Sequence, residues 1–151
     1  MINIIFLIYL LLLGFFDIRE RTVPVVLLAA GSILALGVKL GDFAEMAENP
    51  KWFLAVIVFG AMPGMFMLGV SWMTDKAGAG DGWALINLGL FTDYKTCIVL
   101  WGASMLVMAV ISAGLLALKK VKGSTRLPYL PFLAMAYAVI YTEEVIQGLQ
   151  G

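Results

Sequence analysis

The chain has 151 residues, of which 62% are hydrophobic and 13% are charged, and ten Lys and Arg balance ten Asp and Glu. Soluble domains contain about 45–50% apolar and about 25% charged residues, and a domain of this length still exposes about a third of the surface of its unfolded chain. An apolar excess of this size cannot be buried. The composition therefore excludes a soluble globular protein and predicts a polytopic membrane protein, with no charge excess that would indicate a nucleic-acid partner.

The chain contains no His and a single Cys, Cys97. Without His, the Ser-His and Cys-His nucleophile pairs and the His-ligated zinc proteases are excluded. A single Cys excludes a disulfide framework and a Cys-based metal site within the chain. We therefore expect no metal and no cofactor, and any hydrolytic chemistry has to use carboxylates, Lys, Ser or Tyr.

Charged residues divide the sequence into six apolar segments. A membrane-spanning helix needs about 20 apolar residues, and segments 52–74 and 96–118 meet this length outright. Three further segments are adequate when their polar ends lie at the interface: 2–17, 23–41 and 127–147. Segment 82–92 reaches only about 15 Å, so we expect it to cross where neighbouring helices shield it or where the bilayer is thinned. The predicted fold is an all-α polytopic membrane protein with six transmembrane helices, the fourth short, in a single domain over residues 1–151.

The third apolar segment contains the run from Gly60 to Gly64, with Pro63 inside it. Small residues four positions apart let the backbones of two helices approach closely, so we expect helix packing here and no ligand site. Pro63 removes a backbone donor and is expected to kink the helix.

The positions of Lys and Arg predict the orientation of the segments, because cytoplasmic loops carry an excess of both. With six crossings and the N-terminus outside, the inner loops hold seven basic residues: Arg19, Arg21, Lys76, Lys119, Lys120, Lys122 and Arg126. The outer side holds three: Lys39, Lys51 and Lys95. If segment 82–92 returned to the inner face, the basic cluster at 119–126 would lie outside, so the bias favours a true crossing. The first segment has no basic n-region and no small-residue cleavage site, and we expect it to stay uncleaved.

The first of two notable acidic sites is the block from Asp17 to Pro24. Asp17 ends the first apolar segment, so its carboxylate is expected at or just inside the inner membrane boundary. Arg19 follows at once, and Pro24 is placed where it can open the next helix in its first turn. Taken alone, such a block is typical of a charged turn that fixes the topology.

The second acidic site is the segment 78–81. Gly78 and Gly80 permit a backbone with positive φ and the close approach of another chain. Asp81 begins the fourth apolar segment, where a helix N-terminus favours a carboxylate. Taken alone, this segment is typical of a glycine-rich loop with an N-capping Asp.

The two sites share one predicted side of the membrane. Asp17 ends a segment that runs inward and Asp81 starts a segment that runs outward, so both are expected at the inner face at similar depth. Two carboxylates close together in a poorly hydrated site share a proton and titrate with separated macroscopic pKa values. One carboxylate then activates a water as general base while the other donates to the scissile carbonyl oxygen. The composition permits hydrolysis by such a dyad.

These blocks resemble the signature of the type IV prepilin peptidases, the GxGD class of membrane aspartic proteases. The family pattern is roughly D-x-R-x-x-x-[I/V]-P-N after the first span and G-x-G-D-x-K at the start of the fourth. Here the corresponding residues are DIRERTVP at 17–24 and GAGD at 78–81. A weaker match, LPYLPFL at 127–133, is similar to the proline-bearing start of the last span in the family. The resemblance covers essentially the whole chain in order, spacing and orientation.

The resemblance implies a membrane aspartic endopeptidase that removes the short basic leader of type IV pilin-like precursors. It implies that the enzyme lies in a prokaryotic cytoplasmic membrane, in contact with lipid, with its active site at the cytoplasmic face. Asp17 and Asp81 match the catalytic aspartates. Three further residues match positions that place the loop or the substrate: Gly78, Gly80 and Arg19.

Two residues depart from the family pattern. Val25 stands where the family often has Asn, and Trp83 stands where it often has Lys. Neither replaces a proton-handling aspartate, so we expect catalysis to survive with an altered rate or substrate preference. The larger bacterial members carry an N-terminal cytoplasmic region with a Cys tetrad and use it for N-methylation. This chain resembles the small, peptidase-only form, and we expect no methyltransferase activity.

Two alternatives belong to other classes. The first is a non-catalytic polytopic membrane protein, such as a small transporter or an assembly component, in which Asp17 and Asp81 are structural. A transporter more often carries ionisable residues near the bilayer midplane, and the interiors of the long segments carry none. The second is a protease of the presenilin or signal-peptide-peptidase kind. These share GxGD, but their other aspartate lies in a Tyr-Asp context that this sequence does not contain.

Overall fold

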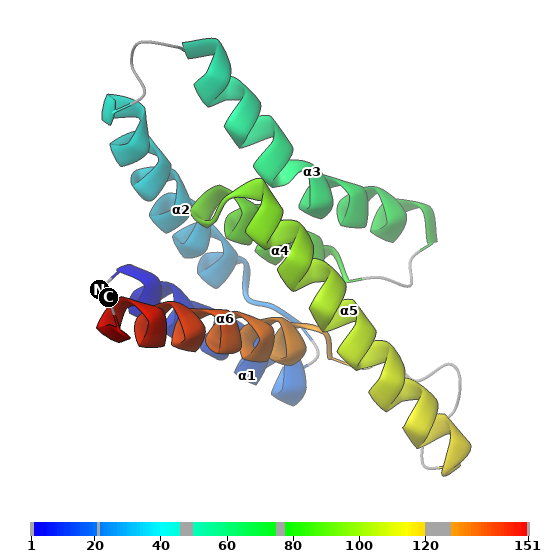
Figure 1. Ribbon diagram of the computed structural model, residues 1–151. Helices are drawn as coiled ribbons and strands as arrows, with labels where there is room; N and C mark the ends of the chain where they lie inside the picture. The colour runs from blue at the N-terminus through cyan, green and yellow to red at the C-terminus, as the bar shows by residue number, and fades with distance from the viewer. Residues whose placement is uncertain (1, 21, 46–49, 75–77, 120–127, 151) are drawn as a thin grey trace. The chain divides into compact units, whose positions relative to one another are not determined.

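The computed structural model describes residues 2–20, 22–45, 50–74, 78–119 and 128–150. Within these ranges the chain forms six α-helices and no strand (Figure 1): α1 (Ile2–Glu20), α2 (Val25–Glu45), α3 (Pro50–Thr74), α4 (Ala79–Phe91), α5 (Tyr94–Ala117) and α6 (Leu130–Gln150). The predicted all-α fold is confirmed, and each predicted apolar segment corresponds to one helix. The fourth helix is the shortest, with 13 residues.

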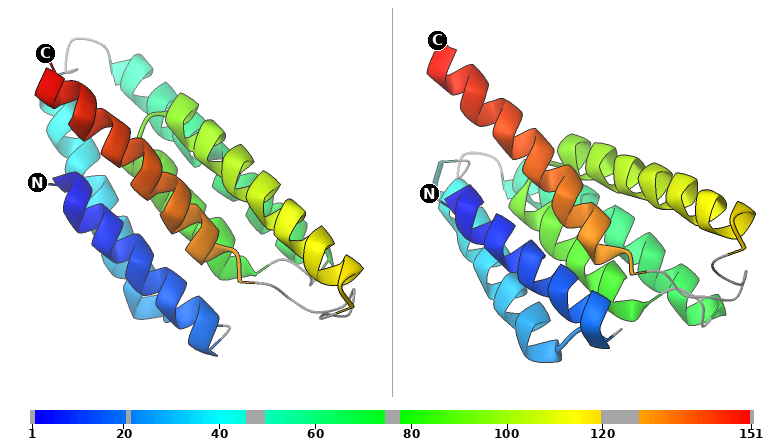
Figure 2. Two further views of the ribbon diagram at one scale, coloured as in Figure 1. Left: turned by 60° about the horizontal axis from the view of Figure 1, so that its bottom comes forward. Right: turned by 90° about the horizontal axis from the view of Figure 1, so that it is seen from below.

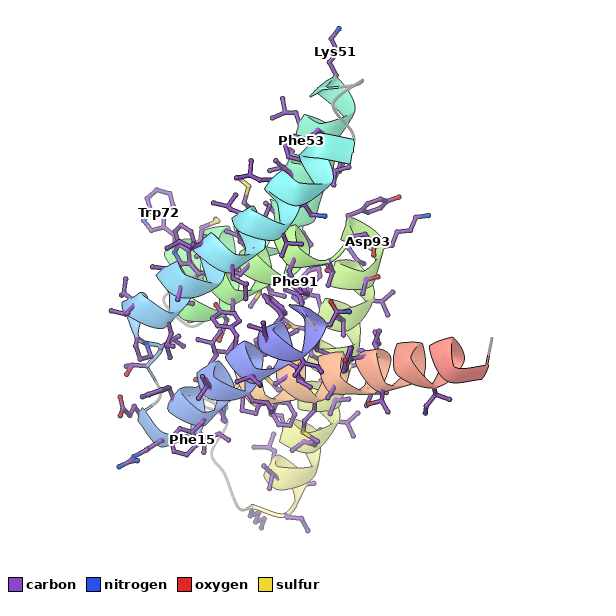
Figure 3. All side chains as sticks on the ribbon, turned by 90° about the vertical axis from the view of Figure 1, so that its left-hand side faces the viewer. Phe15, Lys51, Phe53, Trp72, Phe91 and Asp93 are labelled. Atoms are coloured by element: carbon purple, nitrogen blue, oxygen red, sulfur yellow. The ribbon has the colours of Figure 1, made fainter. Side chains whose placement is uncertain are left out.

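Two stretches are long and apolar enough to cross a membrane, as judged by length and composition. They are Phe53–Met73 in α3 and Tyr94–Ala117 in α5, and shorter apolar stretches occupy Val25–Gly41 and Leu130–Glu143. The outward surface is apolar as well. Trp72 projects from α3 with 88% of its side chain exposed (Figure 3). Exposed apolar surface of this extent is typical of contact with lipid, while the crossing of the membrane by all six helices stays a prediction.

The helices form two compact units, which we describe separately. The first contains Met1–Arg21 and Gly102–Gly151, and the second contains Thr22–Trp101. Helix α5 therefore contributes its beginning to the second unit and its remainder to the first.

In the first unit, α1 and α6 lie side by side and run in opposite directions (Figure 2). The ring of Phe6 is buried between those of Tyr9 and Tyr137, with centroids 5.4 Å and 5.6 Å away. Further along α1, a Cβ placed on Gly14 would lie 3.2 Å from Cα of Pro131. The end of α1 is therefore packed directly on the backbone of the first turn of α6.

Helix α4 is the centre of the second unit, and it packs against both α2 and α3. Its contact with α3 is between backbones, because Gly89 lies against the carbonyl oxygen of Gly60. At a second point of the same contact, a Cβ on Gly64 would lie 2.6 Å from the carbonyl oxygen of Gly82. The close packing predicted for the small residues of the third segment is confirmed. Helix α3 contains Pro63 within its length and bends along its course (Figure 1).

The contact between α4 and α2 contains a buried polar cluster. Asn87 is 0% exposed, and its Nδ2 donates to the backbone oxygen of Leu28 at 3.1 Å. The hydroxyl of Ser32 donates to Oδ1 of Asn87 at 2.9 Å. A buried amide surrounded by apolar side chains needs such partners, and here they hold α4 at one position along α2.

Candidate active site

Asp17 lies in the last turn of α1 and is half-buried. Its carboxylate reaches the start of α6, where the backbone N–H of Leu130 donates to Oδ2 at 3.1 Å. The backbone amide of Tyr129 also hydrogen-bonds this carboxylate. Asp17 therefore caps α6 from a different helix, across 113 positions of sequence.

The hydrogen bonds at the start of α6 explain why this carboxylate lies there. The carbonyl of Tyr129 accepts from the N–H of Phe132 at 3.0 Å and of Leu133 at 3.3 Å, so Tyr129 is the N-cap residue. Pro131 has no N–H to donate. The N–H of Leu130 thus points out of the first turn, where the helix dipole favours a negative charge.

Tyr129 is itself held by a buried hydrogen bond. Its side chain is 3% exposed, and its hydroxyl lies 2.8 Å from Oγ of Ser104, which is 0% exposed. Ser104 belongs to the part of α5 that lies in the first unit. The residue that starts α6 is therefore fixed at both its backbone and its side chain.

The GAGD segment differs in conformation from the sequence-based expectation. Gly78 is the N-cap residue of α4, with φ −75° and ψ 127°, and it makes no side-chain capping bond. Gly80 belongs to the first turn of the helix, and the N–H of Asp81 donates to the oxygen of Gly78 at 3.1 Å. Asp81 is therefore the third helical residue and not the N-cap. No glycine in the described ranges has a positive φ, so Gly78 and Gly80 do not use the left-handed backbone that glycine permits.

Gly78 and Gly80 allow neighbouring side chains to approach the backbone closely. A Cβ on Gly78 would lie 3.0 Å from Oδ2 of Asp81, because that side chain folds back over the N-cap residue. A Cβ on Gly80 would lie 2.9 Å from Cγ2 of Val23. A methyl group at Gly80 would meet the β-branched side chain of Val23, whereas one at Gly78 would meet only the end of the Asp81 side chain, which can move.

The contact between Val23 and Gly80 joins the two sequence motifs inside the second unit. Val23 precedes Pro24, whose carbonyl accepts from the N–H of Leu27 at 3.0 Å and of Leu28 at 3.2 Å. Pro24 therefore stands immediately before α2, one position ahead of the first turn in which it was expected. The end of the first motif thus lies against the glycine that precedes Asp81.

The remaining predicted residues are distributed as follows. Arg19 is exposed in the last turn of α1. Val25 is the first residue of α2 and is 77% exposed, and Trp83 in α4 is 47% exposed.

Asp17 belongs to the first unit and Asp81 to the second, so their pairing stays a prediction. The predicted inner-loop residues Arg21 and Lys76 lie outside the described residues.

Sequence reasoning did not single out the buried polar side chains of α4 and α5. Asn87 and Ser104 are both 0% exposed within otherwise apolar helices. A polar side chain inside an apolar segment is a signal that could have singled them out. The amide of Leu130 carries no side-chain signal, and only the neighbouring Pro131 hinted at a special helix start.

Over the described residues the chain is helical, with apolar outward surfaces and with Asp17 and Asp81 at helix ends, as is common in membrane proteins. The family model of the type IV leader peptidases matches residues 4–142. The chain therefore belongs to the type IV leader peptidase family, and the resemblance found in the sequence is confirmed. Membership identifies it as a peptidase and, together with the apolar helices, as a protein of the inner membrane. No curated protein and no solved structure matches the chain.

Proposed function

We propose that this chain is an aspartic endopeptidase that removes the short leader of type IV pilin-like precursors at the cytoplasmic face of the membrane. Asp17 and Asp81 form its catalytic dyad, within one membrane-embedded domain. The observation that carries the proposal is the contact between Val23 and Gly80. This contact supports a close pairing of the two motifs, each of which bears one aspartate.

The length of the connecting chain supports the pairing further. Val23 follows Asp17 by six positions, and six residues span at most about 20 Å even when fully extended. Because Gly80 is adjacent to Asp81, the contact at Val23 anchors one end of this short connection beside the second aspartate. The first carboxylate is therefore connected to this contact by a short stretch of chain, which is compatible with the proposed dyad.

The reaction requires one proton shared between the two carboxylates. The ionised carboxylate removes a proton from a water, and the resulting hydroxide attacks the scissile carbonyl carbon. The protonated carboxyl donates to the carbonyl oxygen as the tetrahedral intermediate forms. When this intermediate collapses, the C–N bond breaks and the leaving amine takes up the proton that the first carboxylate removed from the water. One hydroxyl of the intermediate returns its proton to the other carboxylate as the new carbonyl forms, so the dyad again holds one proton.

The predicted position of the dyad explains the choice of substrate. A leader of a pilin-like precursor is short and basic, and an apolar helix follows it. An acidic dyad at the inner boundary of the membrane attracts positive charge and meets the chain where the leader joins that helix. Val25 and Trp83 replace residues common in the family, so they are the positions at which the preference for particular precursors would differ.

The test uses the full-length protein in detergent micelles with a pilin-like precursor that carries a basic leader. Asp17→Asn and Asp81→Asn are each expected to reduce cleavage by about 10²–10⁴-fold, the usual contribution of a general acid or base. Asp93→Asn is the matched control. Asp93 lies at the start of α5, and Asn is as good an N-cap as Asp, so this variant should cleave like the wild type.

Thermal unfolding of all three variants separates loss of chemistry from loss of fold. Retained cleavage in a folded Asp17→Asn or Asp81→Asn variant would contradict the dyad. Absence of precursor cleavage by the wild type would favour a non-catalytic membrane protein in which both aspartates are structural.

A further inference from the structure

We propose that Tyr129 is a positioning residue for Asp17. Through its hydrogen bond with Ser104, Tyr129 fixes the start of α6 so that the N–H of Leu130 orients the Asp17 carboxylate. The inference rests on the proposed catalytic role of Asp17. All the residues involved belong to the first unit.

The N–H of Leu130 fixes the orientation of the Asp17 carboxylate. A carboxylate at a helix end rotates freely about its last torsion unless a fixed group holds one oxygen. The N–H of Leu130 is such a group, because it is built into the first turn of α6 and its side chain is 0% exposed. The second oxygen of Asp17 then has a defined direction in which to meet a water or a proton.

Tyr129 holds the N–H of Leu130 in place. Tyr129 provides both the N-cap carbonyl of α6 and an amide that hydrogen-bonds Asp17. Its hydroxyl is bound to Ser104 on α5 in a buried environment. A shift of the Tyr129 backbone would break this side-chain bond, so the α5 contact fixes the position of both amides that reach the carboxylate.

Gly14 allows α1 and α6 to lie in close contact. Gly14 lies three positions before Asp17, on the same face of α1, and a Cβ at Gly14 would lie 3.2 Å from Cα of Pro131. The helices are therefore in backbone contact one turn before the aspartate. With the separation of α1 and α6 set in this way, the start of α6 is placed to orient Asp17.

A group that orients a catalytic carboxylate acts on the chemical step. Misdirecting the carboxylate lowers kcat, because the reacting atoms are no longer aligned, and it leaves substrate binding unchanged. A residue that only stabilises the fold lowers the amount of active enzyme and leaves kcat per folded molecule unchanged. Measuring kcat and KM separately, per folded molecule, therefore distinguishes a positioning role from a purely structural role.

The first experiment compares Leu130→Pro with Leu130→Ala. Both remove the buried leucine side chain, but only proline removes the N–H, and proline is tolerated at the first position of a helix. With a pilin-like precursor as substrate, Leu130→Pro is expected to show a kcat about tenfold below that of Leu130→Ala at the same KM. Equal kcat values for the two folded variants would overturn the proposal.

The second experiment removes the hydrogen bond between Tyr129 and Ser104, and it decides the matter if Leu130→Pro does not fold. Tyr129→Phe and Ser104→Ala are each expected to lower kcat about three- to tenfold at unchanged KM. The double variant should be no slower than the slower single variant, because both substitutions remove the same bond. Thr142→Val is the control, since it removes a hydroxyl that bonds only its own helix, at the oxygen of Ala138, and it should leave kcat unchanged.

Asp17→Asn in the same assay distinguishes failure of this inference from failure of the proposed function. If Asp17→Asn cleaves normally, the catalytic role of Asp17 fails and the positioning role fails with it. If Asp17→Asn is inactive while Tyr129→Phe and Ser104→Ala keep the wild-type kcat, the dyad stands and the positioning role of Tyr129 is overturned.

Discussion

Val23 and Gly80 lie so close together that a Cβ placed on Gly80 would stand 2.9 Å from Cγ2 of Val23 and 3.1 Å from its Cβ. Val23 is the penultimate residue of the motif that begins at Asp17, and Gly80 directly precedes Asp81. A β-branched side chain has little freedom to move away. This contact therefore limits how closely Val23 approaches Gly80.

Gly80→Ala is expected to lower kcat/KM for precursor cleavage about tenfold, because the added methyl group pushes Val23 away from α4. Val23→Ala in the same chain should restore most of the activity, since it removes the atoms that the methyl group meets. Gly69→Ala is the control, because nothing lies within 4 Å of a Cβ at Gly69. Wild-type cleavage by Gly80→Ala would show that this contact has no influence on the site.

Gly89→Ala is expected to destabilise the protein by about 3 kcal/mol, because the new Cβ would meet the backbone carbonyl of Gly60 and not a flexible side chain. Thermal unfolding in detergent measures the change. At Gly102, where a Cβ meets nothing within 4 Å, alanine should be neutral or slightly stabilising because it favours a helix. Similar unfolding temperatures for the two variants would contradict the backbone contact between α3 and α4.

Asn87→Ala is expected to destabilise the second unit by about 1–2 kcal/mol, because it breaks the buried bond to the oxygen of Leu28. Ser32→Ala removes the bond to Oδ1 of Asn87. The double variant should therefore cost less than the sum of the two single changes, with a coupling free energy of about 0.6 kcal/mol or more. Strict additivity in the unfolding free energies would show that the two side chains act independently.

Asp93 predicts a pH-dependent contribution to stability. Partial burial raises the pKa of its carboxyl, but hydrogen bonds from the Thr96 hydroxyl and from the backbone N–H groups of Thr96 and Lys95 outweigh this effect and lower the pKa below its usual 3.8. Figure 3 places Asp93 at the beginning of α5. The ionised form therefore stabilises the helix above pH 3.8, and this stabilisation is lost as the pH falls through the lowered pKa.

The measurement compares the wild type with Asp93→Ala by thermal unfolding from neutral pH down to about pH 2. At neutral pH the variant should be less stable by about 1 kcal/mol, the usual value of an N-cap. This difference should shrink below pH 3.8, because the protonated carboxyl is a poorer acceptor. A difference that is independent of pH would contradict an ionised cap at this position.

The predicted topology places Lys51 outside and Lys119 inside. Cys replacements at these two positions, in a Cys97→Ala background, should react with a membrane-impermeant thiol reagent from opposite faces of intact cells and inverted vesicles. Both side chains are exposed, so access of the reagent does not depend on unfolding. Labelling of both positions from one face would contradict the six-crossing arrangement and, with it, the inner-face position of the two aspartates.

The helices could be predicted from sequence because apolar segments between charges leave the backbone no partner other than itself. Segment 82–92 predicted a short helix, and α4 has 13 residues. Gly60 and Gly64 predicted a close helix contact, but the pattern did not identify Gly89 as the partner. In the GAGD segment the sequence permitted both a positive φ and a close approach. Gly80 uses only the close approach, to Val23, and glycine in a sequence does not distinguish these two reasons.

The sequence predicted the two aspartates of the candidate site, Asp17 and Asp81, but not the groups that surround them. Asp17 was identified by its place after an apolar segment, but its partner is a backbone amide at Leu130, and every residue except proline has such an amide. Ser104 and Tyr129 meet only through the packing of α5 against the start of α6. Contacts of this kind arise from tertiary structure, and no local spacing predicts them.

The backbone contact between α3 and α4 also has a mechanical consequence. Two helices that touch at Gly60 and Gly89 cannot slide past each other without a steric clash, so α3 and α4 have to move as one rigid pair. The contact between Gly64 and Gly82 lies on the Trp72 side of Pro63, so a displacement of the start of α4 is expected to move Trp72, which is 88% exposed. Its indole fluorescence is expected to report a displacement of α4, although Trp72 lies on a different helix.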